Sequence, residues 1–142
     1  YNAVIPSNDQ WCQVTIGAFT GAQYAEIGCD LRMANPPTQS WYTCNASRNA
    51  SATSYIADYD GTPAGLVSEN ATTWGAGDQL RCEAQGIALR LYRIVGTTKT
   101  LLLSTTSAAH TSGKTGIYVF VNTGGNLANA QADDFAMGSL AP

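Results

Sequence analysis

Apolar and polar residues alternate in short runs along most of this 142-residue chain. Alternation with a period of two is typical of β-strands that have one buried face. In residues 10–16, for example, Cys12, Val14 and Ile16 share one face and the residues between them share the other. Helical periodicity is almost absent. The pattern predicts about nine strands, over residues 10–16, 24–33, 41–46, 54–59, 79–84, 87–95, 100–104, 116–122 and 130–137.

Turn residues separate these runs at strand-like intervals, which favours a sandwich or a barrel. The segment Asn35-Pro36-Pro37 ends one run, because neither proline can donate a hydrogen bond to a sheet. No repeat recurs and no linker divides the chain, so residues 1–142 are predicted to form a single all-β domain. The segment 132–138 is predicted to be the last strand, which returns to close the fold beside the first.

The composition narrows the class of protein. Charged residues make up only 12% of the chain, whereas Ser and Thr supply 26 of its 142 residues, which suits an extracellular module better than a cytosolic enzyme. The net charge is −3 and the seven basic residues are scattered, so the sequence has no basic patch for nucleic acid or an anionic membrane. No apolar run is long enough for a membrane span. A first residue of Tyr1 indicates that a leader was removed or that the sequence begins inside a longer product.

Four cysteines lie at positions 12, 29, 44 and 82, and the alternation places Cys12, Cys29 and Cys82 on core-facing sides of their strands. Their spacing matches no zinc pattern. An even number of cysteines predicts two disulfides in an oxidising compartment, and the alternative is four buried free thiols that fill space in the core. Three pairings are possible. We expect Cys29 to pair with Cys44, because the hairpin that turns at the prolines brings them nearly opposite, and Cys12 to pair with Cys82.

Seven short motifs, each weak alone, occur in an informative order. They are Asn8-Asp9-Gln10-Trp11, Gly28-Cys29-Asp30-Leu31-Arg32, Ser40-Trp41-Tyr42, Gly77-Asp78-Gln79-Leu80-Arg81, Gly86-Ile87-Ala88-Leu89-Arg90-Leu91-Tyr92, Thr111-Ser112-Gly113-Lys114-Thr115-Gly116-Ile117 and Asp133-Asp134-Phe135. Together they resemble the concanavalin A-like lectin/glucanase jelly rolls, particularly the laminin-G-like modules of bacteria and phages, over residues 8–138.

This resemblance implies a two-sheet antiparallel jelly-roll sandwich with one concave face. Members include sugar-binding modules, glycoside hydrolases, polysaccharide lyases and structural domains of adhesins and virions. They usually have one more strand before the segment that matches Asn8, pairing near the closing strand. In this chain only residues 1–6 are available for that strand, so either they or a neighbouring polypeptide must supply it.

Hydrolysis of a glycoside requires two carboxyl groups a few ångströms apart. The hydrolases that the chain resembles carry them two or four residues apart on one strand. Only Glu26 with Asp30, or Asp58 with Asp60 at a turn, approaches this spacing, and neither matches the Glu-x-Asp-x-x-Glu pattern of the glucanases. A stripe of Glu26, Asp30 and Arg32 is ordinarily a solvated strand face, and His110 is expected on the surface. The sequence therefore does not favour an enzyme.

Sugar binding requires aromatic rings for the apolar face of a pyranose and planar polar groups for its hydroxyls. The candidates on the polar sides of predicted strands or near turns are Asp30, Arg32, Trp41, Arg90 and Tyr92. The alternative is that the tryptophans, which also include Trp11 and Trp74, cap the edges of the core and that Arg32 is structural.

Asp133 and Asp134 are weak candidates for a structural calcium site, and no other cofactor is expected. Sequons begin at Asn45, Asn49 and Asn70, which is close to the number expected by chance in so Ser/Thr-rich a chain. The sequence thus leaves two main hypotheses for a module outside the cell or on a virion or cell surface. The first is carbohydrate binding. The second is a structural role in an assembly, such as a capsid decoration or appendage subunit, in which the partner is a neighbouring subunit or a second copy of the chain.

Overall fold

The computed structural model describes residues 8–21, 24–34, 39–48, 50–51, 53–122 and 127–141. These residues form ten strands and one short 3-10 helix, η1 (Leu127–Asn129). The strands are β1 (Gln10–Phe19), β2 (Ala25–Met33), β3 (Ser40–Arg48), β4 (Ser54–Asp60), β5 (Pro63–Glu69), β6 (Gln79–Gln85), β7 (Ala88–Val95), β8 (Thr98–Thr106), β9 (Lys114–Val121) and β10 (Ala130–Ser139). Within this part of the chain, no helix is long and apolar enough to cross a membrane.

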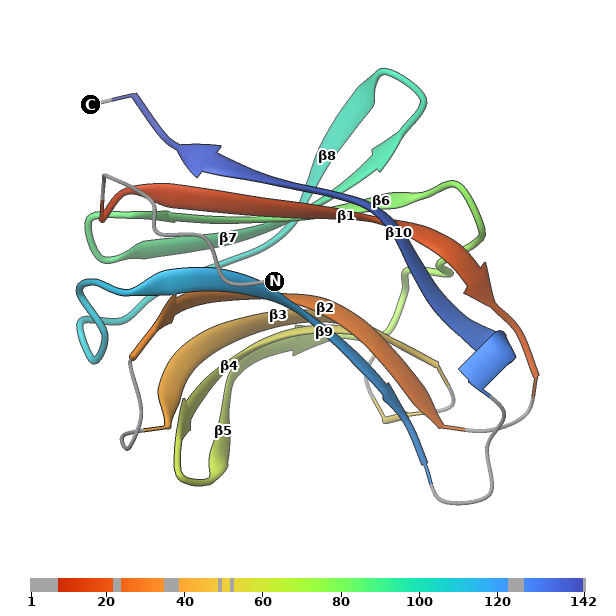
Figure 1. Ribbon diagram of the computed structural model, residues 1–142, viewed down its shortest axis with the longest axis horizontal. Helices are drawn as coiled ribbons and strands as arrows, with labels where there is room; N and C mark the ends of the chain where they lie inside the picture. The colour runs from red at the N-terminus through yellow and green to blue at the C-terminus, as the bar shows by residue number, and fades with distance from the viewer. Residues whose placement is uncertain are drawn as a thin grey trace.

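The strands form two stacked sheets of five, in the orders β10-β1-β6-β7-β8 and β5-β4-β3-β2-β9 (Figure 1). The strand pairs whose register is defined are all antiparallel. The closing strand β10 pairs with β1 from Gln10 opposite Ser139 to Phe19 opposite Ala130, so the predicted closure beside the first strand is confirmed. The expectation of a two-sheet antiparallel sandwich is confirmed as well.

The period-two alternation explains the core. The apolar residues of facing strands, among them Val14 and Ile16 of β1 and Ile27 and Leu31 of β2, are fully buried between the sheets. The sheet that contains β2, β3 and β4 is bowed, with its convex side against the other sheet (Figure 1). Its concave side faces away from the core, and the residues of the opposite phase point toward it.

One strand was missed by the sequence prediction. β5 starts with Pro63, contains Gly65 and is mostly exposed, so its sequence has no continuous alternation to mark it as a strand. It lies at the edge of its sheet and, among the described strands, pairs only with β4. The predicted role of residues 1–6 as partner of the closing strand concerns a segment outside the described residues.

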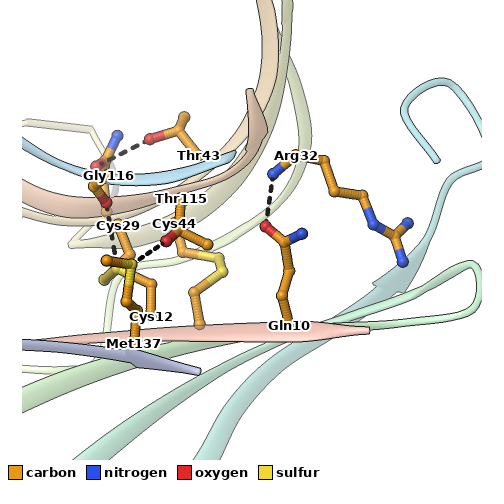
Figure 2. The surroundings of a disulfide bond; sticks show 11 residues. Gln10, Cys12, Cys29, Arg32, Thr43, Cys44, Thr115, Gly116 and Met137 are labelled. Atoms are coloured by element: carbon orange, nitrogen blue, oxygen red, sulfur yellow. Dashed lines mark hydrogen bonds between the residues drawn. A yellow bond between two sulfur atoms is a disulfide. The ribbon is translucent and has the colours of Figure 1, made fainter. Parts of the chain in front are cut away.

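Both disulfides join the two sheets, and the predicted pairing was wrong. One bond joins Cys12 to Cys29 (Figure 2) and the other joins Cys44 to Cys82, whereas Cys29–Cys44 and Cys12–Cys82 were expected. The expected pairs are indeed direct neighbours, Cys29 opposite Cys44 on β2 and β3, and Cys12 opposite Cys82 on β1 and β6.

All four side chains point into the core, so each cysteine also faces the other sheet. The bonded Cα atoms lie 5.8 Å and 6.0 Å apart, within the usual range for a disulfide. Stacked sheets are ordinarily about 10 Å apart. The sheets therefore approach closely at the cysteines, which the small size of the side chain permits.

Candidate functional site

The concave face of the bowed sheet carries a groove made of two adjoining hollows. Their volumes are about 410 Å³ and about 320 Å³. All five strands of the sheet contribute side chains, and the residues shared by both hollows are Tyr24, Glu26, Tyr55, Ala57 and Pro63. The larger hollow extends toward β5, whereas the smaller one extends to Trp41 and to the aromatic residues of β9.

Cross-strand register assembles the groove. On β3 the residues of the core phase are Tyr42, Cys44 and Ala46, so Trp41, Thr43 and Asn45 point to the concave side. Their partners on β4 are Tyr59, Ala57 and Tyr55 in that order. Each cross-strand pair adds one row to the floor or wall of the groove.

Aromatic rings stand on two sides of the groove. The rings of Trp41 and Tyr59 are stacked, with centroids 4.1 Å apart and an angle of 16° between their planes. Across the sheet, Tyr118 and Phe120 of β9 lie parallel at 6.4 Å, and Tyr24 meets Phe120 edge-on at 5.8 Å. Flat apolar rings with hydroxyls between them are suited to a ligand that has both an apolar face and many hydroxyls.

Glu26 is the centre of a hydrogen-bond network on the floor. Its carboxylate accepts hydrogen bonds from the hydroxyls of Tyr24, of Tyr55 at 2.5 Å and of Ser47 at 3.3 Å. The amide of Asn45 donates to the Tyr55 oxygen at 2.8 Å. Burial, and then the hydrogen bond to Glu26, raise the pKa of both Tyr24 and Tyr55. These hydroxyls therefore stay protonated and directed at Glu26.

Asp30 lies four residues further along β2 on the same face and is also buried, with 6% of its surface exposed. Burial raises the pKa of its carboxyl from 3.8 to about 6, and a hydrogen bond from Thr43 opposes the shift. The same Thr43 hydroxyl donates to Asn45 Oδ1 at 3.2 Å, so Asp30 and Asn45 compete for its single proton. Asp30 Oδ1 has no hydrogen-bond partner among the described residues.

The side chain of Asn45 separates the two carboxyl groups. It packs over Gly28, midway between Glu26 and Asp30, so closely that a Cβ on Gly28 would lie 1.7 Å from Asn45 Oδ1. A pair of catalytic carboxyl groups must face the same glycosidic bond with space between them. Here an amide that is itself hydrogen-bonded fills that space.

No protein-family model and no curated protein sequence matches the chain. Its backbone is similar to that of the carbohydrate-binding module CBM66 from Bacillus subtilis, with a TM-score of 0.65 and 12% identity over 98% of this chain and 74% of that one. Sheep galectin-11, solved in complex with glycerol, has a TM-score of 0.64 and 7% identity over 96% of this chain and 94% of its own. A functionally unknown protein from Saccharomyces cerevisiae has a TM-score of 0.64 and 11% identity, over 100% of this chain and 74% of its own.

The fold is a concanavalin A-like jelly roll. The five residues predicted from the sequence as a sugar site lie in three separate places on it. Asp30 and Trp41 lie on the concave face. Arg90 and Tyr92 lie on the outer face of the other sheet, where Arg90 Nη1 donates to Gln85 Oε1 at 3.3 Å and Lys99 Nζ lies 3.9 Å from the Tyr92 ring centroid. The jelly roll therefore does not bring the five together.

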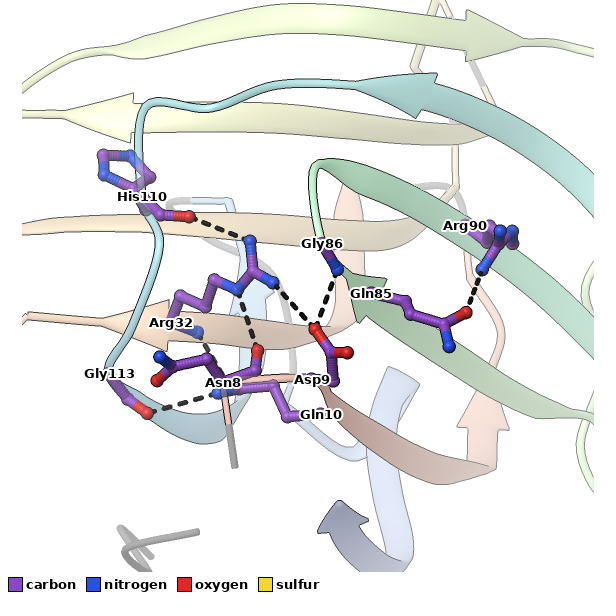
Figure 3. Close-up of polar contacts among 9 residues, drawn as sticks. All are labelled: Asn8, Asp9, Gln10, Arg32, Gln85, Gly86, Arg90, His110 and Gly113. Atoms are coloured by element: carbon purple, nitrogen blue, oxygen red, sulfur yellow. Dashed lines mark hydrogen bonds and ion pairs between the residues drawn. The ribbon is translucent and has the colours of Figure 1, made fainter. Parts of the chain in front are cut away.

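Arg32 is a structural residue of the jelly roll. Its guanidinium donates to the backbone oxygens of Asn8 at 3.1 Å and His110 at 3.0 Å and lies 3.7 Å from the Asp9 carboxylate (Figure 3). Its backbone N–H donates to Gln10 Oε1 from a left-handed conformation, with φ of 55°. Burial lowers the pKa of the guanidinium. It ties the start of β1 and the loop before β9 to the end of β2.

Two expectations about exposure were wrong. Glu26, Asp30 and Arg32 are 4%, 6% and 2% exposed, so the stripe is not a solvated strand face. His110 is largely buried: its ring packs 4.7 Å from that of Tyr42, and its Nε2 lies 2.5 Å from Asp58 Oδ1. Contacts with distant segments bury both Arg32 and His110, and the alternation within a single strand does not reveal such contacts.

The remaining candidates are the predicted calcium ligands and the three sequons. Asp133 and Asp134 are exposed on β10, and the described residues contain no cluster of three or more His, Cys, Asp or Glu that could hold a metal, so calcium there stays a prediction. Of the sequons, Asn45 is buried in the groove floor, Asn70 is exposed after β5, and Asn49 lies outside the described residues.

Proposed function

We propose that this chain is a carbohydrate-binding module and that an oligosaccharide binds in the concave groove. The observation that carries the proposal is the stacked pair of Trp41 and Tyr59, two partly exposed rings beside a floor rich in hydroxyls. The apolar face of a pyranose packs on such rings while its hydroxyls reach the floor. The carbohydrate-binding module and the galectin among the similar structures support the same assignment.

The length of the groove favours a chain of sugars over a single one. Its lining residues come from all five strands, and four spacings between neighbouring strands amount to about 19 Å. The site is open along the face of the sheet, so an oligosaccharide can enter without any end being enclosed.

We further propose that the module is non-catalytic and acts outside the cell or on a particle surface. The amide of Asn45 between Glu26 and Asp30 supports binding without hydrolysis. The two disulfides support an oxidising compartment, where such bonds persist.

A glycan array tests the function. The unmodified protein should be retained by at least one class of oligosaccharide, and Trp41→Ala should weaken that binding about tenfold, the effect of losing roughly 1.4 kcal/mol of ring contact. Trp11→Ala is the matched control, because Trp11 lies on the outer face of the other sheet against Arg81. Absence of retention by any glycan would reject the function, and equal binding by Trp41→Ala would remove that ring from the site.

A second candidate, a structural subunit, is favoured by the edge strand β9. Ile117 and Val119 are each 38% exposed there, and an edge strand with apolar side chains is suited to pairing with another chain. Size-exclusion chromatography with light scattering separates the candidates: ordered oligomers with no glycan retention support the subunit, and a glycan-binding monomer supports the module.

A further inference from the structure

The groove is almost free of formal charge. Among the described residues that line it, Glu26 is the only acidic side chain and no basic side chain is present. All seven Lys and Arg residues of the chain lie elsewhere, namely Arg32, Arg48, Arg81, Arg90, Arg93, Lys99 and Lys114. A negatively charged ligand would therefore meet a carboxylate and find no cation to pair with.

The hydrogen bonds within the groove floor also determine which polar groups remain for a ligand. The hydroxyl protons of Tyr24 and Tyr55 are donated to Glu26, so the oxygen of Tyr24 presents lone pairs to a ligand, whereas one lone pair of Tyr55 already accepts from Asn45. Asn45 donates to Tyr55 and accepts from Thr43, so its hydrogen bonds serve the floor itself. The floor therefore presents mainly hydrogen-bond acceptors to a ligand, because the tyrosine hydroxyls direct their protons to Glu26.

We propose that Glu26, by directing the tyrosine hydroxyls toward itself, makes the groove select neutral or amino-bearing oligosaccharides and exclude acidic ones. This inference rests on the proposed carbohydrate-binding function and names its ligand class. Neutral sugar hydroxyls and ammonium groups can donate hydrogen bonds to the acceptor oxygens of the groove floor. A carboxylate or sulfate has no proton to donate and is repelled by Glu26 at close range.

Glu26 acts through its neighbours and is a positioning residue. Replacement by glutamine keeps the shape but removes the charge, and the new amide group donates a hydrogen bond where the carboxylate only accepted. The hydroxyls of Tyr24, Tyr55 and Ser47 all donate to one oxygen, Oε1, so the amide oxygen of glutamine can keep accepting from them while its NH2 group offers a ligand a new donor. Glu26→Gln should therefore admit ligands that the unmodified protein excludes, an effect that a purely structural role would not produce.

The test is an array of β-glucan, galactan and mannan oligosaccharides, chitosan oligosaccharides with free amines, and oligogalacturonate, alginate and sulfated oligosaccharides. The unmodified protein should bind the best neutral or amino-bearing ligand at least tenfold more tightly than any acidic one. In Glu26→Gln this ratio should fall to threefold or less. Glu83→Gln is the matched control, because Glu83 is an equally buried carboxylate on the other sheet, paired with Arg81 and Lys99.

The outcomes distinguish the inference from the function. If no glycan is retained, the carbohydrate-binding function fails. If glycans are retained but acidic ones bind as tightly as neutral ones, the function stands and the inference is overturned. An unchanged ratio in folded Glu26→Gln overturns the role of Glu26. Should circular dichroism show that this variant does not fold, Tyr24→Phe, which keeps the ring and removes one acceptor oxygen, must weaken neutral ligands without improving acidic ones.

Discussion

The carboxyl of Asp30 should make the stability of this protein fall as the pH rises from about 4 to 6. It is 6% exposed, and one of its oxygens has no hydrogen-bond partner in the described part of the chain. Its pKa rises from 3.8 to about 6, because burial penalises the charged form more than the hydrogen bond from Thr43 favours it. The folded state therefore keeps a proton that the unfolded state has already lost.

The size of the effect follows from the shift. Well below pH 4 the carboxyl is protonated in both states and costs nothing. Well above pH 6 it is ionised in both, and a shift of about two units corresponds to a loss of about 3 kcal/mol in the free energy of unfolding. Asp30→Asn removes the ionisable carboxyl group and with it the pH dependence that this group causes. Its amide can donate to Thr43 Oγ1, which leaves the Thr43 proton for Asn45.

Urea unfolding of the unmodified protein and of Asp30→Asn, at intervals from pH 4 to pH 7, measures how the free energy of unfolding of each depends on pH. Other carboxylates produce the opposite slope: for Glu83, hydrogen bonds from Lys99 and Arg81 outweigh burial and lower its pKa. The informative quantity is therefore the stability of Asp30→Asn minus that of the unmodified protein, which should rise by about 2.4 kcal/mol between pH 4 and pH 7. Asp60→Asn removes an exposed carboxylate of the same sheet and serves as the control. A difference that stays constant with pH would refute the account of Asp30.

Two further outcomes follow from the core and the groove floor. Tryptic digestion without reduction should release residues 1–32 as one peptide with an internal Cys12–Cys29 bond and should join peptides 33–48 and 82–90 through Cys44–Cys82. Either other pairing would link all three peptides, as mass spectrometry would reveal. Gly28→Ala should destabilise the fold by about 1–3 kcal/mol and weaken glycan binding, because its Cβ would displace Asn45. Gly65→Ala, whose Cβ would meet nothing within 4 Å, should leave thermal stability nearly unchanged in the same melting experiment.

Local alternation was enough to predict nine of the ten strands, because it records which face of each strand is buried, and the resemblance supplied the choice of a sandwich over a barrel. It was not enough to place the site. A polar phase points outward from either sheet, and the sequence does not say which sheet a strand joins. Asp30 and Arg90 therefore looked equivalent, although they lie on opposite outer faces of the sandwich.

The aromatic residues of the groove were missed for a related reason. Tyr55 and Tyr59 share a phase in the predicted strand 54–59, and their meeting with Asn45 and Trp41 depends on the register between β3 and β4. That register could have been tested by pairing the two segments so that their apolar phases coincide. Such a test could not have found Tyr118 and Phe120, because β9 pairs with β2 although the two strands lie more than 80 residues apart in sequence.

The disulfides and the groove depend on the same register. On β2 and β3 the core phase carries Cys29 and Cys44, and the phase between them carries Glu26, Thr43 and Asn45. A slip of one residue between these strands would turn the cysteines toward the concave face and the polar residues into the core. Each cysteine is bonded to the opposite sheet, so neither strand can slip while its bond is intact. The bonds therefore hold the opposing positions of β2 and β3 that place Asn45 over Gly28 and form the floor of the groove.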